Sequence, residues 1–153
     1  MFVIVDGTGP VTNSAYYQAM QGSFCHQIYT RRQKDAIYHR GPAGIGLTNT
    51  ISIKLVAQIE ARYGLQPDLI TMRATAAHYV ASPEKSAPMS PQEPLYLAGY
   101  SRGGACVLDI AHRLYASHPK LVISGAFLFD PVTRDPTLKD KVAPNIQEVY
   151  VAY

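Results

Sequence analysis

Tryptophan is absent from this sequence, cysteine occurs only twice, and charged residues make up just 16% of the 153 positions. Cys25 and Cys106 stand far apart, with no second cysteine or paired histidines at metal-site spacing, so neither a zinc cluster nor a disulfide framework is indicated. No apolar run approaches the roughly 18 residues of a membrane-spanning helix, and the first apolar run is too short for a signal peptide. We therefore expect a protein that is cytoplasmic as synthesised, with no signal peptide and no integral membrane segment.

A strong charge of either sign is missing as well. The formal net charge is +3, and lysine and arginine are scattered rather than gathered in the basic runs that follow a phosphate backbone. Nucleic acid is therefore not an expected partner. Apolar residues make up 47% of the chain, which at this length is typical of one soluble domain, and we take residues 1–153 as a single domain.

What the sequence does contain is a regular alternation of strand and helix patterns. Short β-prone apolar runs predict strands at 2–5, 36–39, 95–98, 122–129 and 148–153. Periodic apolar positions predict a short helix capped within 12–14 and ended by Gly22, then helices over 48–63, 67–81 and 105–115, with a proline-rich loop over 82–94. This order favours an α/β fold, a three-layer sandwich with a mainly parallel sheet and helices on both faces.

One segment carries a catalytic pattern. Gly99-Tyr100-Ser101-Arg102-Gly103 fits G-x-S-x-G, and it lies between a predicted strand and a predicted helix, the context that a nucleophile elbow needs. So sharp a turn strains the backbone of the serine, and the glycines two residues away on either side avoid steric collisions. Ser101 is therefore the predicted nucleophile, with the Arg102 amide as an oxyanion donor. The plainer interpretation is a tight glycine turn whose serine merely caps the helix.

A serine hydrolase also needs a second oxyanion donor and an acid. Gly7 and Thr8 follow the first buried strand and are the candidates for the donor, although the same residues also suit a simple turn. Asp130 directly follows the strand predicted at 122–129 and is the candidate for the carboxylate that orients a histidine. Aspartate before proline is also a common turn former, and Asp135 is the reserve candidate.

The histidine base is not evident. In serine hydrolases built on such a nucleophile elbow, the catalytic residues occur along the chain in the order serine, acid, histidine. No histidine follows His118 in this sequence. His112 and His118 belong to the far part of the helix after Ser101, and His26 and His78 have no supporting context. His39 ends the second predicted strand and is the one candidate near the site, although a surface or structural role explains it better. Without a base the serine stays a weak nucleophile.

Two other functions, a phosphatase and a nucleotide-binding protein, fit the sequence poorly. Asp6-Gly7-Thr8 after an apolar strand is similar to haloacid-dehalogenase-type phosphatases, but the nucleophilic aspartate expected two residues earlier is Ile4. The glycine-rich stretch 41–50 lacks both the G-K-[ST] of a P-loop and the third glycine of a dinucleotide fingerprint.

Four segments together resemble a known family. FVIVDGTG, YHRGPAGIG, LYLAGYSRGGA and AFLFDPV, in this order, resemble the α/β-hydrolase domain of type VI secretion phospholipase effectors and their uncharacterised relatives. That family opens with a strand and D-G-T, uses G-x-S-R-G for its elbow, and has D-T-V after the next strand. Here Asp130-Pro131-Val132 differs from the last motif by one residue. The resemblance spans most of the chain.

The resemblance implies a function. It implies ester hydrolysis of a lipase or phospholipase type through an acyl-enzyme on Ser101, with Asp130 orienting a histidine and no metal or organic cofactor. Phospholipid is the implied substrate, and other carboxylic esters stay open. It also implies export as an effector and a secretion-system or immunity partner. A non-catalytic binding module on the same scaffold, or a degenerate fragment, is the alternative that the missing histidine favours.

In that family a histidine closely follows the strand after the acid. The present sequence reaches Tyr153 on its last predicted strand without one, so we expect the reading frame to be partial or prematurely ended. A sheet edge left uncovered would expose unpaired backbone and apolar side chains, and we expect the isolated chain to be poorly soluble.

Overall fold

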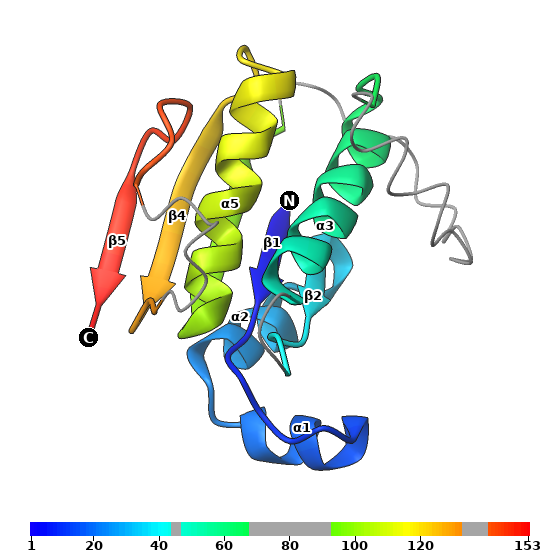
Figure 1. Ribbon diagram of the computed structural model, residues 1–153, viewed down its shortest axis with the longest axis vertical. Coiled ribbons are helices and arrows are strands. Elements are labelled where there is room, and N and C mark those ends of the chain that lie inside the picture. The colour runs from blue at the N-terminus through cyan, green and yellow to red at the C-terminus, as the bar shows by residue number, and fades with distance from the viewer. Residues whose placement is uncertain (44–46, 68–92, 133–140) are drawn as a thin grey trace.

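The computed structural model describes residues 1–43, 47–67, 93–132 and 141–153 (Figure 1). Its centre is a five-stranded sheet in the order β2-β1-β3-β4-β5, and every neighbouring pair is parallel. The strands are β1 (Phe2–Val5), β2 (Ala36–His39), β3 (Leu95–Tyr100), β4 (Ile123–Phe129) and β5 (Val149–Ala152). The expected α/β class and parallel sheet are confirmed, and β3 continues two residues beyond its predicted end.

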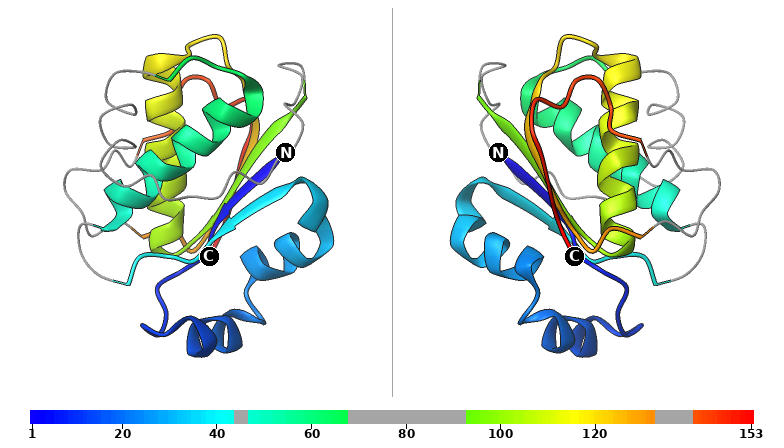
Figure 2. Two further views of the ribbon diagram at one scale, coloured as in Figure 1. Left: turned by 90° about the vertical axis from the view of Figure 1, so that its right-hand side faces the viewer. Right: turned by 90° about the vertical axis from the view of Figure 1, so that its left-hand side faces the viewer.

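Helices lie on both faces of this sheet (Figure 2). One face packs against α3 (Leu47–Tyr63) and α5 (Arg102–Ser117), and the other against α2 (Phe24–Arg32), which leads through a short 3₁₀ turn, η1 (Gln33–Asp35), into β2. The small helix α1 (Asn13–Met20) lies beyond the carboxyl ends of the strands. None of the helices within these described ranges is long and apolar enough to cross a membrane.

The sequence patterns missed one helix and mistook the start of another. The prediction for α5 began at residue 105, but the helix begins at Arg102, directly after Ser101. No helix was predicted over α2, because only Cys25 is buried along it and its apolar periodicity is weak. Ser23 starts α2 instead, since its hydroxyl oxygen accepts the His26 N–H at 2.9 Å. The helix predicted over 67–81 lies outside the described residues.

The core follows from strands that are buried on both sides. Val3, Val5 and Leu97 pack toward α3 and α5, whereas Ile4 and Ala98 face α2 and Cys25. Continuous apolar runs are expected of central parallel strands covered on both faces. Gly64 ends α3 with φ +63, the left-handed cap that its position predicts.

The strand order creates a natural place for a site. β2 and β3 lie on opposite sides of β1, so the connections leaving β1 and β3 diverge where the strand order reverses. In open parallel sheets, ligands bind outside the carboxyl ends of the strands at such a switch point. The residues that follow β1 and β3 are 6–9 and Ser101.

Candidate active site

Ser101 occupies a one-residue turn between β3 and α5. Its φ of 53° and ψ of −125° place it in a backbone region that side-chain-bearing residues rarely adopt, at a cost of roughly 1–3 kcal/mol. The surrounding backbone holds this conformation. The Ser101 N–H donates to the Phe129 carbonyl at 2.9 Å, and the Ser101 carbonyl accepts from Gly104 at 2.9 Å and Val132 at 3.0 Å.

The two glycines of the motif make the turn sterically feasible. A Cβ on Gly103 would lie 2.1 Å from the Val5 carbonyl oxygen, and one on Gly99 would lie 2.6 Å from the Gly103 oxygen. Both collisions are with backbone, which has little freedom to move. Gly99 and Gly103 therefore let the start of α5 pack directly on the ends of β1 and β3.

The strained backbone gives a stability prediction. Glycine accepts positive φ without steric cost, so Ser101→Gly is expected to raise the free energy of unfolding by about 1 kcal/mol. The matched control is Ser14→Gly within α1, where glycine is expected to lower it by about 0.5–1 kcal/mol. Urea denaturation of both variants measures the difference. If Ser101→Gly were as destabilising as the control, the strain assigned to Ser101 would be wrong.

The loop after β1 lies against this turn. A Cβ on Gly7 would be 3.5 Å from the Cβ of Ser101 and 2.6 Å from the Tyr100 ring. Asp6, fully buried, accepts the Gly7 N–H at 2.8 Å through Oδ1, and its Oδ2 accepts the hydroxyls of Ser23 at 2.5 Å and Tyr38 at 2.8 Å. The Gly7 amide is thus already engaged. The Thr8 amide makes no hydrogen bond with the described residues and is the donor left in this loop.

Tyr16 joins the loops that follow β1 and β2. Its buried hydroxyl donates to the Gly7 carbonyl at 2.6 Å and accepts the Gly41 N–H at 2.7 Å, and the Arg40 guanidinium lies 4.5 Å from the centre of its ring. Burial raises the pKa of Tyr16, which keeps the phenol protonated and able to donate. Gly41 approaches so closely that a Cβ there would lie 2.1 Å from the Gly7 oxygen.

Removing the Tyr16 hydroxyl is expected to lower the stability of the protein. Tyr16→Phe leaves the Gly7 carbonyl and the Gly41 N–H unpaired in a buried place, so the free energy of unfolding is expected to fall by about 2 kcal/mol or more. Tyr17→Phe, on the exposed side of the same helix, is the matched control and is expected to change it by less than about 0.5 kcal/mol. Thermal or urea unfolding measures both. Equal effects of the two variants would contradict the bridging role of Tyr16.

The side chain of Arg102 also reaches this loop. Its Nε donates to the Thr8 Oγ1 at 2.7 Å, and its Nη2 donates to the Pro42 carbonyl at 2.8 Å. The sequence motif identified only the backbone amide of Arg102. The Arg102 amide is the first N–H of α5 and lies at the positive end of this helix.

Asp130, like Ser101, lies at the carboxyl ends of the strands, and it follows β4, the neighbour of β3 in the sheet. It directly follows β4, is exposed, and has a positive φ of 44°. Its N–H donates to the Ala152 carbonyl at 2.6 Å, which places the end of β5 beside it. Its carboxylate has no hydrogen-bond partner in the described part of the chain. The reserve candidate, Asp135, lies outside the described residues.

The histidines that the structure describes are all engaged away from Ser101. His39 contacts the Arg40 carbonyl through Nδ1 at 2.6 Å, and burial lowers its pKa so that the ring is neutral at neutral pH. The remaining contacts are those of His26 with the Tyr29 and Tyr38 rings, His112 with the Lys141 carbonyl, and His118 with Glu60. His78 lies outside the described residues. No described histidine therefore contacts Ser101 or Asp130.

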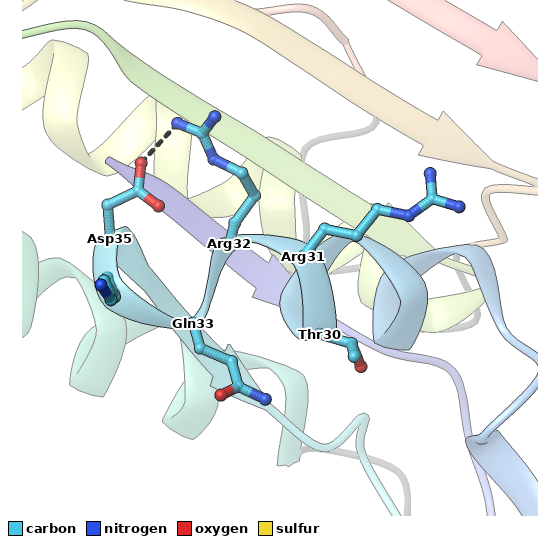
Figure 3. Close-up of a pocket in the computed structure, with 6 residues that line it drawn as sticks. Thr30, Arg31, Arg32, Gln33 and Asp35 are labelled. Atoms are coloured by element: carbon cyan, nitrogen blue, oxygen red, sulfur yellow. Dashed lines mark hydrogen bonds and ion pairs between the residues drawn. The ribbon is translucent and has the colours of Figure 1, made fainter.

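A surface hollow elsewhere is unrelated to this site. It is lined by residues 30–35, at the end of α2, and Figure 3 shows Arg32 paired with Asp35 while Arg31 points away from both. β2 begins directly afterwards at Ala36, so the hollow lies at the amino-terminal end of a strand, whereas Ser101 follows the carboxyl end of β3. The described residues also contain no group of three or more His, Cys, Asp or Glu side chains that could hold a metal ion.

Comparison with known proteins gives no further information about this site. A scan against protein-family models and searches of curated proteins and of solved structures returned no match. The candidate active site is therefore defined by its own residues: the strained Ser101 turn, the loops after β1 and β2 packed against it, and Asp130 at the adjoining strand end.

Proposed function

We propose that this chain carries the nucleophile of a serine ester hydrolase with an α/β-hydrolase-like fold, acting through an acyl-enzyme on Ser101. The observation that carries the proposal is the positive φ of Ser101 in a one-residue turn between a parallel strand and a helix, next to the switch point of the sheet. Strained backbone of this kind persists where the surrounding structure over-determines it, and it concentrates at functional sites. A serine that only capped α5 would accept a helix N–H, and Ser101 makes no such side-chain bond.

The arrangement suits attack on an ester carbonyl. The Ser101 oxygen adds to the carbonyl carbon as its proton passes to a base, and the carbonyl oxygen becomes an oxyanion. The Arg102 amide, at the positive end of α5, is one proposed donor to that oxyanion. The Thr8 amide is the other, because the Gly7 amide is held by Asp6. The intermediate then expels the alcohol, leaving the acyl group on Ser101, and water later releases the acid.

Asp130 is the proposed orienter of the base. A parallel sheet brings its strand ends to one edge, and the Asp130 N–H is bonded to Ala152 at the end of β5. A histidine following β5 in the reading frame would therefore reach the edge shared by Ser101 and Asp130, in the order serine, acid, histidine. The family resemblance is the reason to expect such a histidine.

The proposed substrate is a lipid ester. The resemblance suggests phospholipid, and an aromatic surface near the strand end is compatible with an apolar acyl group: Phe24 is 61% exposed and stacks on Phe129, the residue before Asp130, with ring centres 5.0 Å apart. The proposed chemistry draws on side chains and backbone amides and involves no cofactor. Export as an effector, with a secretion-system or immunity partner, remains a proposal from the resemblance.

The test is hydrolysis by the full reading frame that contains this chain. Nitrophenyl esters of increasing acyl length and phospholipid vesicles are offered in parallel, before and after dialysis against a chelator. The proposal expects turnover of esters that survives chelation and increases with acyl length. Absence of turnover and of reaction with a fluorophosphonate would instead support the non-catalytic binding module.

A further inference from the structure

We propose that Arg102 is a positioning residue. Its side chain holds the loop after β1, residues 6–9 (the Thr8 loop), against the Ser101 turn, so that the two oxyanion donors keep a fixed separation. The inference rests on the proposed function, since the donors are the amides of Arg102 and Thr8. It adds a role for a side chain that the G-x-S-x-G motif leaves unspecified. The role proposed for the guanidinium is to position the two donors, not to act on the substrate.

Two hydrogen bonds of the guanidinium join three segments of the chain. Arg102 belongs to the first turn of α5, Thr8 to the loop after β1, and Pro42 to the loop after β2. The bonds of 2.7 Å to Thr8 Oγ1 and 2.8 Å to the Pro42 carbonyl leave from different nitrogens of one planar group. A planar fork with fixed donor directions fixes relative positions as well as distances, which the flexible ammonium of lysine does not.

The Thr8 loop requires such a fastening. Thr8 is exposed and lies between two glycines, Gly7 and Gly9, and glycine restricts its own backbone less than any other residue does. The Gly7 side of the loop is held by Asp6 and Tyr16, as described above. The Arg102 bond is the side-chain contact that continues this hold to Thr8 itself. Since a displacement of about 1 Å at a catalytic group can cost about a hundredfold in rate, small freedom at Thr8 matters.

Two pairs of variants isolate this contact. Thr8→Val removes the hydroxyl acceptor but keeps the branched side chain and the amide, whereas Thr8→Ser restores an acceptor. Arg102→Gln removes the fork, and Arg113→Gln is its matched control on the same helix, because Arg113 pairs with Asp109 and Asn49 away from Ser101. Each variant, and the double variant of Thr8→Val with Arg102→Gln, is made in the full reading frame.

The primary measurement is the second-order rate of fluorophosphonate labelling, with the melting temperature measured on the same samples. Thr8→Val and Arg102→Gln are each expected to slow labelling by about tenfold or more, at nearly unchanged melting temperature. Arg113→Gln is expected to label within about twofold of the parent. Thr8→Ser, which keeps a hydroxyl acceptor for Arg102, is expected to recover most of the rate that Thr8→Val loses. The double variant is expected to be no slower than Arg102→Gln alone, because both changes break one contact.

Two results would overturn the inference. Labelling of Thr8→Val at the parental rate would show that the contact positions nothing, and fully additive effects in the double variant would show that the two residues act separately. If the parent protein does not label, the proposed function fails instead. Hydrogen exchange over residues 6–12 then still tests the fastening, since Thr8→Val should speed exchange there and Thr8→Ser should not.

Discussion

Ser101→Ala is expected to abolish ester hydrolysis by the full reading frame, with a loss of at least about 10³-fold in kcat/KM. The alanine side chain offers no atom to attack the ester carbonyl, so no acyl-enzyme forms and only the oxyanion donors remain. Folding should survive, because the Ser101 side chain makes no capping bond and alanine at φ 53° is strained to the same degree as serine. Hydrolysis of a soluble nitrophenyl ester, measured with the melting temperature, provides the test.

The control for that variant is Ser117→Ala, in the last turn of α5. Ser117 Oγ donates to the Arg113 carbonyl of the same helix, so its loss changes a serine without touching the candidate active site. Parental activity is expected there. A Ser101→Ala protein that is folded and hydrolyses the ester at the parental rate would refute Ser101 as the nucleophile.

Gly103→Ala is expected to have the largest effect on stability, lowering the free energy of unfolding by about 3 kcal/mol or more. The added methyl would meet the Val5 oxygen at 2.1 Å and the Asp6 oxygen at 2.4 Å. These are backbone atoms at the end of β1, so relief requires α5 to move away from the sheet. Since the same movement carries the Ser101 turn away from the Thr8 loop, any folded fraction should also lose activity.

Gly22→Ala is the matched control for Gly103→Ala. Gly22 lies between α1 and α2, has no positive φ, and a methyl added there would meet no described atom within 4 Å. Its effect on the free energy of unfolding is expected to stay within about 0.5 kcal/mol. Urea denaturation compares the two variants. Similar midpoints for both would contradict the close packing of α5 on the end of β1.

Local patterns predicted much of the fold because its strands are buried. The apolar runs at 2–5 and 122–129 predicted β1 and the whole of β4 with one residue added at its start, and Gly64 predicted the end of α3. α2 was missed for a physical reason: it buries one side chain, Cys25, and takes its start from the Ser23 cap. A helix that packs on β1, β2 and β3 while burying a single side chain has no strong periodic signal in the sequence.

The candidate active site was predictable only where its geometry is local. G-x-S-x-G specified the strained turn because a one-residue turn from strand to helix is a local constraint on the backbone, and Ser101 has the positive φ expected of such a turn. The contacts of Arg102 with Thr8, of Tyr16 with Gly41, and of Asp6 with Tyr38 join residues far apart in the chain. No single sequence reveals such pairs. The available signal was the position of Asp6 directly after the apolar run 2–5, because a carboxylate buried at such a strand end requires hydrogen-bond donors.

The most direct test of the central claim is to map the site of fluorophosphonate modification. The full reading frame is treated with the probe, digested, and analysed by peptide mass spectrometry. The proposed function predicts one adduct, on the Ser101 hydroxyl, with no modification of a denatured sample. An adduct on another serine, or none on a folded protein, would contradict the assignment of this turn as a nucleophile elbow.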